Sequence, residues 1–152
     1  MTLHRFNGDE IFNVESATID YYIDEGRSYA TTFRADVSIP PIQSLSDTEE
    51  LRAKPFVEIT IQLPKVPSLM LQKGRSFSLA RGYNDASGEY LTNFYYCEHE
   101  LMDNIEIVVV ARKLDRVQLR ITGTTMDVNY YDGSKPATKV EIEAEFILSL
   151  GL

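Results

Sequence analysis

The sequence predicts an all-β domain, an antiparallel β-sandwich or flattened barrel of about eight to nine strands with one short helix near residues 46–53. Three observations carry this prediction. Apolar and polar residues alternate with period two along several stretches, which is typical of strands with one face in the core and one in water. Turn-forming residues separate these stretches at short intervals. Only one segment has the pattern of a helix.

The clearest strands are predicted at residues 29–39 and 139–150. Alternate residues from Tyr29 to Ile39 are apolar or aromatic except for Thr31, with Arg34 and Asp36 on the opposite face. The second stretch alternates apolar residues with glutamates in the same way. Further strands with this pattern are expected at residues 17–23, 57–63, 77–79, 90–97, 105–111, 117–122 and 124–131. Gly123 interrupts the alternation and indicates a bulge.

The predicted helix over residues 46–53 rests on a capping box. Ser46 is in the capping position, and Glu49 follows three residues later. Pro55 disfavours helical geometry at Lys54 and ends the segment. The helix would be a turn or two that connects strands.

Length, charge and composition exclude several classes of protein. The chain has 152 residues with 15 basic and 23 acidic side chains, so the formal net charge is −8. This length fits one domain over residues 1–152. Sixteen aromatic residues (7 Phe and 9 Tyr) argue against disorder, and the acidic balance argues against a nucleic-acid-binding surface. The most continuous apolar run, residues 105–111, is too short to span a membrane.

Cys97 is the single cysteine, so a disulfide-stapled secreted scaffold is excluded. The N-terminal residues show no signal-peptide pattern. We therefore expect a cytoplasmic protein, with export by a signal-independent route left open.

Motifs for catalysis are absent from the sequence. The only histidines are His4 and His99, and no Gly-x-Ser-x-Gly or phosphate-binding glycine motif occurs. No cofactor is indicated apart from calcium. A non-catalytic protein is favoured over an enzyme.

Tyrosine pairs provide the first candidate binding residues. The pairs are Tyr21-Tyr22, Tyr95-Tyr96 and Tyr130-Tyr131, and one ring of each pair should face out of the sheet. We assign Tyr22, Tyr95 and Tyr130 to an interaction surface, because exposed tyrosines are favoured at interfaces. The alternative is that tyrosine simply suits a pleated surface.

An acidic row provides the second candidate. Glu141, Glu143 and Glu145 lie on one face of the predicted last strand. Arg116 and Arg120 would lie on a facing strand and form a charge ladder. The alternative is an acidic strip that docks a basic partner.

A loop provides the candidate metal ligands. Asn84, Asp85 and Glu89 share a glycine-rich loop, and Asp127 and Asp132 flank another turn; oxygen ligands of this kind suit calcium. Such residues also serve as ordinary turn formers.

These observations leave three hypotheses. The first is a non-catalytic binding or assembly protein that presents tyrosines and acids to a protein partner or to copies of itself. The second is a protein or enzyme that binds a small carbohydrate or lipid-like ligand at the barrel mouth. The third is a calcium-dependent loop module. Fold alone does not decide between them.

Overall fold

The computed structural model describes residues 1–149. Strands hold 56 % of the residues and helix 3 %, which confirms the all-β prediction. The elements are β1 (Thr2–Arg5), β2 (Gly8–Ile11), β3 (Val14–Ile23), β4 (Tyr29–Val37), β5 (Phe56–Leu63), α1 (Pro67–Met70), β6 (Ser76–Leu79), β7 (Tyr83–Asn84), β8 (Glu89–Tyr90), β9 (Thr92–Tyr96), β10 (Glu98–Glu100), β11 (Met102–Lys113), β12 (Arg116–Thr125) and β13 (Thr138–Leu148). The strand predicted over 124–131 ends at Thr125, and residue 150 of the predicted last strand lies outside the described residues.

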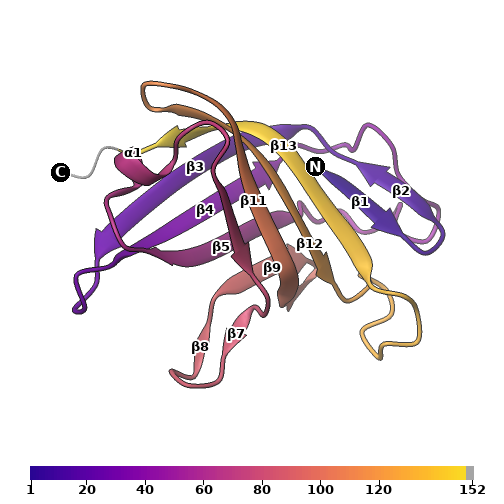
Figure 1. The fold of residues 1–152 in the computed structure, drawn as a ribbon. Helices are drawn as coiled ribbons and strands as arrows, with labels where there is room; N and C mark the ends of the chain where they lie inside the picture. Colours follow the sequence, from indigo (N-terminus) through magenta and orange to yellow (C-terminus); the bar gives the residue numbers. More distant parts are fainter. Residues whose placement is uncertain (150–152) are drawn as a thin grey trace.

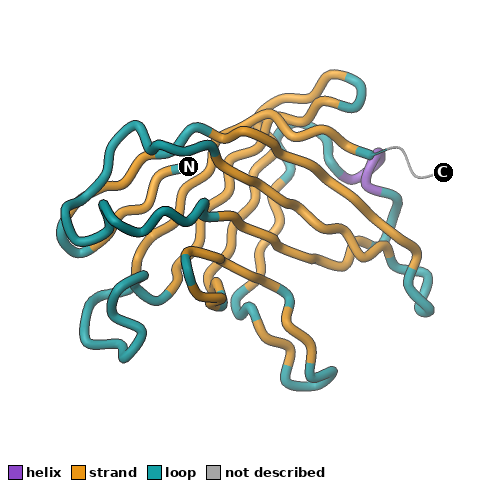
Figure 2. The backbone as a smooth tube through the Cα atoms, turned by 180° about the vertical axis from the view of Figure 1, so that it is seen from behind, coloured by secondary structure: helices purple, strands orange, loops and turns teal. Residues whose placement is uncertain are grey.

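One sheet makes up most of the fold. Nine strands follow one another in the order β10-β9-β5-β4-β3-β13-β12-β11-β6, and β1 and β2 extend the sheet beside β13. The sheet curls around its own inner face (Figure 1), and from behind it is continuous, with the β7–β8 hairpin projecting from one edge (Figure 2). Of the two predicted architectures, the curled sheet resembles the flattened barrel rather than two facing sheets.

One pairing makes the sheet mixed. β13 pairs with β1 in antiparallel fashion near its start, where Glu141 lies opposite Thr2. Near its end β13 pairs with β3 in parallel, where Ile147 lies opposite Thr18. The expectation of a purely antiparallel sheet is therefore wrong at this junction, because period-two alternation does not report strand direction.

Gly82 joins the two ends of the curled sheet. Its carbonyl accepts hydrogen bonds from the Leu91 N–H at 2.7 Å and the Thr92 N–H at 3.2 Å, and the Leu91 carbonyl accepts one from the Thr60 N–H at 2.8 Å. A Cβ at Gly82 would overlap Thr92 Oγ1 and the Met102 carbonyl oxygen. Glycine is therefore required for the backbones to approach this closely.

Apolar side chains fill the inside of the curl. The largest fully buried side chains come from most of the long strands and include Ile19, Phe33, Ile59, Ile107, Leu119, Ile142 and Phe146. β4 alternates as predicted, with Phe33, Ala35 and Val37 buried and Arg34 and Asp36 facing out. The outer face is consequently the polar face.

The predicted helix over residues 46–53 is wrong. Residues 46–50 form turns, with hydrogen bonds from the Thr48 N–H to Leu45 O and from the Leu51 N–H to Thr48 O. So short a segment does not recover the cost of helix nucleation, and the side chains of Asp47 and Thr48 bond to β1 and β2 instead. The helix in the described chain is α1, with Pro67 in its first turn.

The bulge predicted at Gly123 lies on the opposite strand. Gly123 pairs regularly with Val140, while β11 shifts register between Asp103 and Glu106. A Cβ at Gly123 would lie 2.6 Å from Ile105 Cδ1, so the glycine makes room for the bulged strand. Among the described residues, no helix is long and apolar enough to cross a membrane.

Candidate functional site

A hollow of about 530 Å³ lies where β5, β9 and β10 run side by side. Alternation along β5 leaves Glu58 and Thr60 on the outer face. Asn93 of β9 lies opposite Glu58, and β10 adds His99 and Glu100 to the wall. We call this hollow the β9–β10 groove.

A row of stacked side chains borders the groove. The Tyr95 ring stacks on Phe56 with centroids 5.3 Å apart, and its centroid lies 4.9 Å from that of His99. On the other side of the row, the Arg34 guanidinium lies 4.4 Å from the Phe56 ring centroid. Of the three predicted tyrosines, Tyr95 is the one that the structure brings to the groove. The row holds the groove wall rigid, since aromatic and cation–π contacts each add stability beyond burial.

Polar contacts fix most of the groove side chains. His99 Nδ1 lies 2.9 Å from Asn93 Oδ1, and the Arg34 guanidinium donates to Glu58 Oε2 at 3.2 Å. Glu100 is different, because no hydrogen bond or ion pair joins its carboxylate to another described residue. Partial burial raises the pKa of Glu100, and the neighbouring charge of Glu98 raises it further. The groove therefore contains a partly buried carboxylate that forms no ion pair with another described residue.

Tyr90 forms the remaining wall of the groove. It lies on β8, and its side chain is 76 % exposed. Its ring meets Tyr83 of the same hairpin edge to face, with centroids 5.1 Å apart. Tyr90 and Glu100 thus line the same hollow, and both an aromatic face and a carboxylate are groups that attract cations.

The other predicted tyrosines lie elsewhere. Tyr22 is 62 % exposed on β3, which β4 and β5 separate from β9. Tyr130 packs its ring edge to face against Phe6, with Lys135 Nζ 5.1 Å from its centroid. The three predicted tyrosines thus do not form one surface.

The acidic row on β13 forms the predicted charge ladder. Arg116 donates to Glu145 at 2.6 Å, and Arg120 lies 3.7 Å from Glu143. Glu141 Oε2 lies 3.0 Å from His4 Nε2 on β1. Each glutamate therefore has a basic or imidazole neighbour, and the row offers little free charge to a partner.

The predicted calcium ligands lie on the β7–β8 hairpin in turn roles. Asn84 Oδ1 accepts hydrogen bonds from the Ala86 and Ser87 N–H groups, and Asp85 pairs with Arg81 at 3.3 Å. Glu89 lies opposite Asn84 across the hairpin. Within residues 1–149, no three His, Cys, Asp or Glu side chains are grouped so that they could hold a metal ion.

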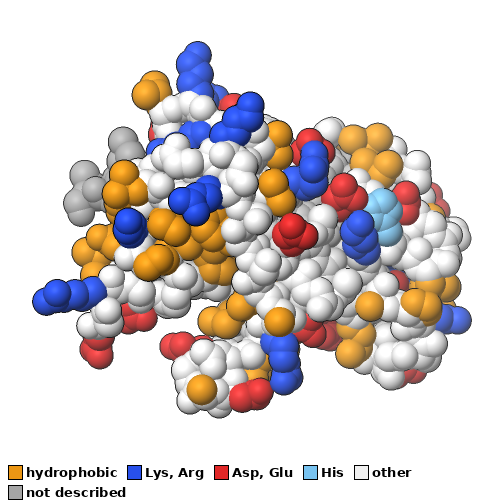
Figure 3. All heavy atoms as spheres, viewed as in Figure 1, with side chains coloured by type: hydrophobic (Ala, Val, Ile, Leu, Met, Phe, Trp, Pro, Cys, Tyr) orange, Lys and Arg blue, Asp and Glu red, His pale blue; other side chains and the backbone are white. Residues whose placement is uncertain are grey.

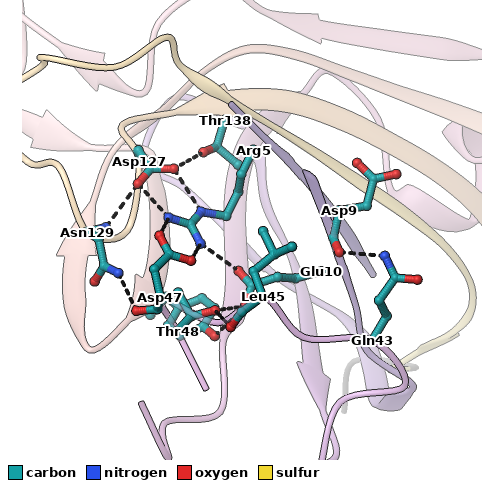
Figure 4. A network of polar contacts seen from close by, with 11 residues as sticks. Arg5, Asp9, Glu10, Gln43, Leu45, Asp47, Thr48, Asp127, Asn129 and Thr138 are labelled. Carbon is teal, nitrogen blue, oxygen red and sulfur yellow. Dashed lines mark hydrogen bonds and ion pairs between the residues drawn. The ribbon is translucent and has the colours of Figure 1, made fainter. Parts of the chain in front are cut away.

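Asp127, proposed above as a loop ligand, belongs to a buried polar cluster that the sequence analysis missed (Figure 4). Arg5 has a fully buried side chain and donates to both oxygens of Asp127, each at 2.9 Å. The same guanidinium donates to both oxygens of Asp47, at 2.8 and 2.9 Å. Burial alone would lower the pKa of Arg5, but these hydrogen bonds raise it above its usual value.

A third carboxylate lies beside Arg5. Glu10 is fully buried, and its Oε2 is 3.6 Å from Arg5 Nη1 without a hydrogen bond to a described residue. Its Oε1 accepts hydrogen bonds from Thr48 Oγ1 and, at 3.1 Å, from the Tyr96 hydroxyl. The Arg5 cluster, defined as Arg5, Glu10, Asp47 and Asp127, therefore ties β1 and β2 to two loops. The side chains of Arg5, Glu10 and Asp127 are fully buried and only Asp47 is partly exposed, so we assign the cluster a structural role as a fastener between these segments.

Simple alternation could have indicated this cluster. Leu3 and Arg5 share a face of β1, and Leu3 is buried, so Arg5 had to point inward as well. The groove gives no comparable signal, because it depends on how β9 and β10 fold beside β5.

Searches of protein-family models, curated proteins and solved structures find no match to this chain.

Proposed function

We propose that this chain is a non-catalytic protein-binding module and that the β9–β10 groove takes a basic side chain of its partner. The observation that carries the proposal is Glu100, a partly buried carboxylate with a raised pKa and no cationic partner among the described residues. A lysine or arginine of a partner would supply the missing positive charge.

The neighbours of Glu100 support the same ligand chemistry. Glu58 contributes a second carboxylate, which Arg34 only partly neutralises because that arginine also pairs with Asp36 at 2.8 Å. The exposed ring of Tyr90 provides a face for the incoming cation. The hollow, its two carboxylates and the exposed tyrosine ring therefore all suit an arginine or lysine side chain.

Selection from a displayed library of random peptides tests this proposal. The immobilised chain should enrich peptides that contain arginine or lysine. Glu100→Gln and Tyr90→Ala should each lower the recovery of those peptides about tenfold, since buried charge pairs and aromatic anchors dominate interface energies. Glu25→Gln, an exposed acid on the β3–β4 turn, is the matched control and should leave recovery unchanged. Enrichment without basic residues, or equal recovery by Glu100→Gln, would refute the proposal.

We expect the partner to be a different protein. The alternative under the same hypothesis is that the chain binds a second copy of itself. Light scattering on the purified chain distinguishes them, because a partner that is a second copy would give a dimer or larger species that Glu100→Gln dissociates. The cytoplasmic location and the lack of nucleic-acid binding stay predictions.

A small apolar ligand is the second candidate function. Another hollow of about 520 Å³ has apolar lining residues that include Phe12, Pro40 and Leu51. Its polar lining residues are Ser44, Thr48, Glu49, Arg52 and Tyr96. A dye such as Nile red should fluoresce on binding there, and Ala53→Phe should abolish the signal by filling the space. Unchanged fluorescence in that variant would exclude this hollow.

A further inference from the structure

β6 is an edge strand with an open backbone. It pairs only with β11, and the Val109 N–H donates to Arg75 O while the Gly74 N–H donates to Val109 O. In an antiparallel pair the bonded residues alternate, so the N–H and C=O groups of Ser76 and Ser78 point away from β11. No hydrogen bond joins these groups to another described residue. Both serines are exposed and too small to block the edge.

β6 lies at the end of the sheet order opposite β10, with β11 as its strand neighbour. On the other side of the molecule's curl, β5 pairs with β9 over Phe56–Ile59 and through Thr60. Phe77 and Leu79 of β6 and Met70 of α1 are only partly buried against the core. Figure 3 shows hydrophobic side chains gathered in the region of α1, with Lys and Arg side chains around them. The β6 edge therefore combines partly exposed apolar side chains with unpaired backbone.

The segment of chain that contains β6 has a charge opposite to that of the chain as a whole, and the acid nearest to it across the ladder is Glu106 of β11, opposite Ser78. Residues 59–84 contain no Asp or Glu but four basic residues, in a protein whose net charge is −8. Lys65, Lys73 and Arg75 make no ion pair within residues 1–149, whereas Arg81 pairs with Asp85. Native edge strands usually block pairing with a charge or a proline inside the strand, and Ser76–Leu79 has neither. The basic groups flank the edge without covering it.

We propose that the β6 edge binds an acidic, extended segment of a partner protein by strand addition. The segment would hydrogen-bond to Ser76 and Ser78. Alternate side chains would cover Phe77 and Leu79, and acidic residues at the ends of the segment would meet Lys73 and Arg75. Charge complementarity selects an acidic occupant over a second β6 edge, because pairing β6 with β6 of another copy would bring Lys73, Arg75 and Arg81 of the two chains together. The edge strand β10 at the other end of the sheet is acidic but only three residues long, so a longer acidic segment of another protein is proposed.

A labelled twelve-residue peptide tests the proposal by fluorescence anisotropy. The probe alternates valine and threonine in its centre and carries two glutamates at each end, and the control peptide replaces the glutamates with lysines. The probe should bind with an affinity that falls as salt rises, and the control peptide should bind at least tenfold more weakly.

Two variants separate backbone pairing from charge. Ser78→Pro removes an N–H that faces away from β11, so the fold should be kept while probe binding falls at least tenfold. The double variant Lys73→Gln with Arg75→Gln should weaken binding about tenfold and flatten its salt dependence. Arg27→Gln, a cation on the β3–β4 turn, is the matched control and should have no effect.

Three results would overturn the proposal. They are equal binding of both peptides, undiminished binding by a folded Ser78→Pro variant, and self-association of the chain that Ser78→Pro abolishes. The third result would assign the edge to a second copy. Since Glu100→Gln alters only the β9–β10 groove, probe binding by that variant should be unchanged, and the two proposals fail independently.

Discussion

Replacing Arg5 with methionine is the sharpest test of what holds the fold together. The substitution keeps most of the side-chain volume but removes the guanidinium that donates four hydrogen bonds to Asp47 and Asp127. It also leaves three carboxylates, including Glu10, next to one another with their cation gone.

The expected loss of stability is large. Removing one member of a buried ion pair costs about 3–5 kcal/mol, because the remaining charge stays desolvated. At about 2–4 °C per kcal/mol for a chain of this size, the melting temperature should fall by roughly 6–20 °C. The exposed pair of Arg120 and Glu143, 3.7 Å apart, gives a matched control, since surface pairs are worth about 0–1 kcal/mol.

Urea unfolding followed by far-UV circular dichroism measures both variants. Arg5→Met should lose about 3–5 kcal/mol of unfolding free energy and Arg120→Met less than about 1 kcal/mol. If Arg5→Met does not fold, Asp47→Ala, which removes the partly exposed member, should still fold and lose about 1–3 kcal/mol. A folded Arg5→Met variant within about 1 kcal/mol of wild type would refute the assignment of the cluster as a fastener.

The same cluster predicts a pH dependence. The hydrogen bond from Arg5 is the largest cause that lowers the pKa of Asp47. Burial raises the pKa of Asp127, but the hydrogen bonds from Arg5, the Asn129 N–H and Thr138, together with the charge of Arg5, outweigh burial and lower its net pKa. A lowered pKa in the folded state means stability that is present above the unfolded value, about 3.9, and is lost as pH falls through the folded value. The difference between wild type and Arg5→Met should therefore be full at pH 7 and shrink below about pH 4.

Three further predictions concern single positions. The carboxylates of Glu141 and Asp9 raise the pKa of His4 above 6.5. His4→Gln should therefore lower the free energy of unfolding below pH 6.5, and this loss should disappear as pH rises through the pKa of His4 in the folded protein. Chemical denaturation of both proteins at pH 5.5 and 8.5 measures the difference. Leu114→Gly should raise unfolding free energy by about 0.5–1 kcal/mol, since this exposed residue holds φ at 57°; a fall in melting temperature would contradict it. Gly82→Ala should cost about 1–3 kcal/mol through its overlap, measured against Gly26→Ala.

Period-two alternation predicted the strands well because burial of one face is a local property. β4 and β13 follow it almost residue by residue, and Arg116 and Arg120 face the glutamates of β13 as expected. The direction of a strand relative to its neighbour, by contrast, depends on which strands become adjacent in the sheet, as where β13 pairs with β3. That information is not in either stretch alone.

The helix predicted from local sequence pattern was wrong because side chains distant in the sequence bond to residues of that segment. Residues 46–53 have a sound capping box, but Asp47 and Thr48 bond to Arg5 and Glu10 across about forty residues of sequence. The candidate site was predicted only through Tyr95, because the groove depends on the fold of β9 and β10 beside β5. The tyrosine pairs predicted that one ring of each pair would face out of the sheet, but they did not predict which of these rings would lie close together.

The β9–β10 groove is proposed to bind a basic side chain through Glu100. A double-mutant cycle measures it most directly, with the best selected peptide, its arginine replaced by glutamine, and the chain with and without Glu100→Gln, each affinity taken by isothermal titration calorimetry. We predict a coupling free energy of about 1–3 kcal/mol between the peptide arginine and Glu100. Additive effects, with a coupling near zero, would contradict the claim.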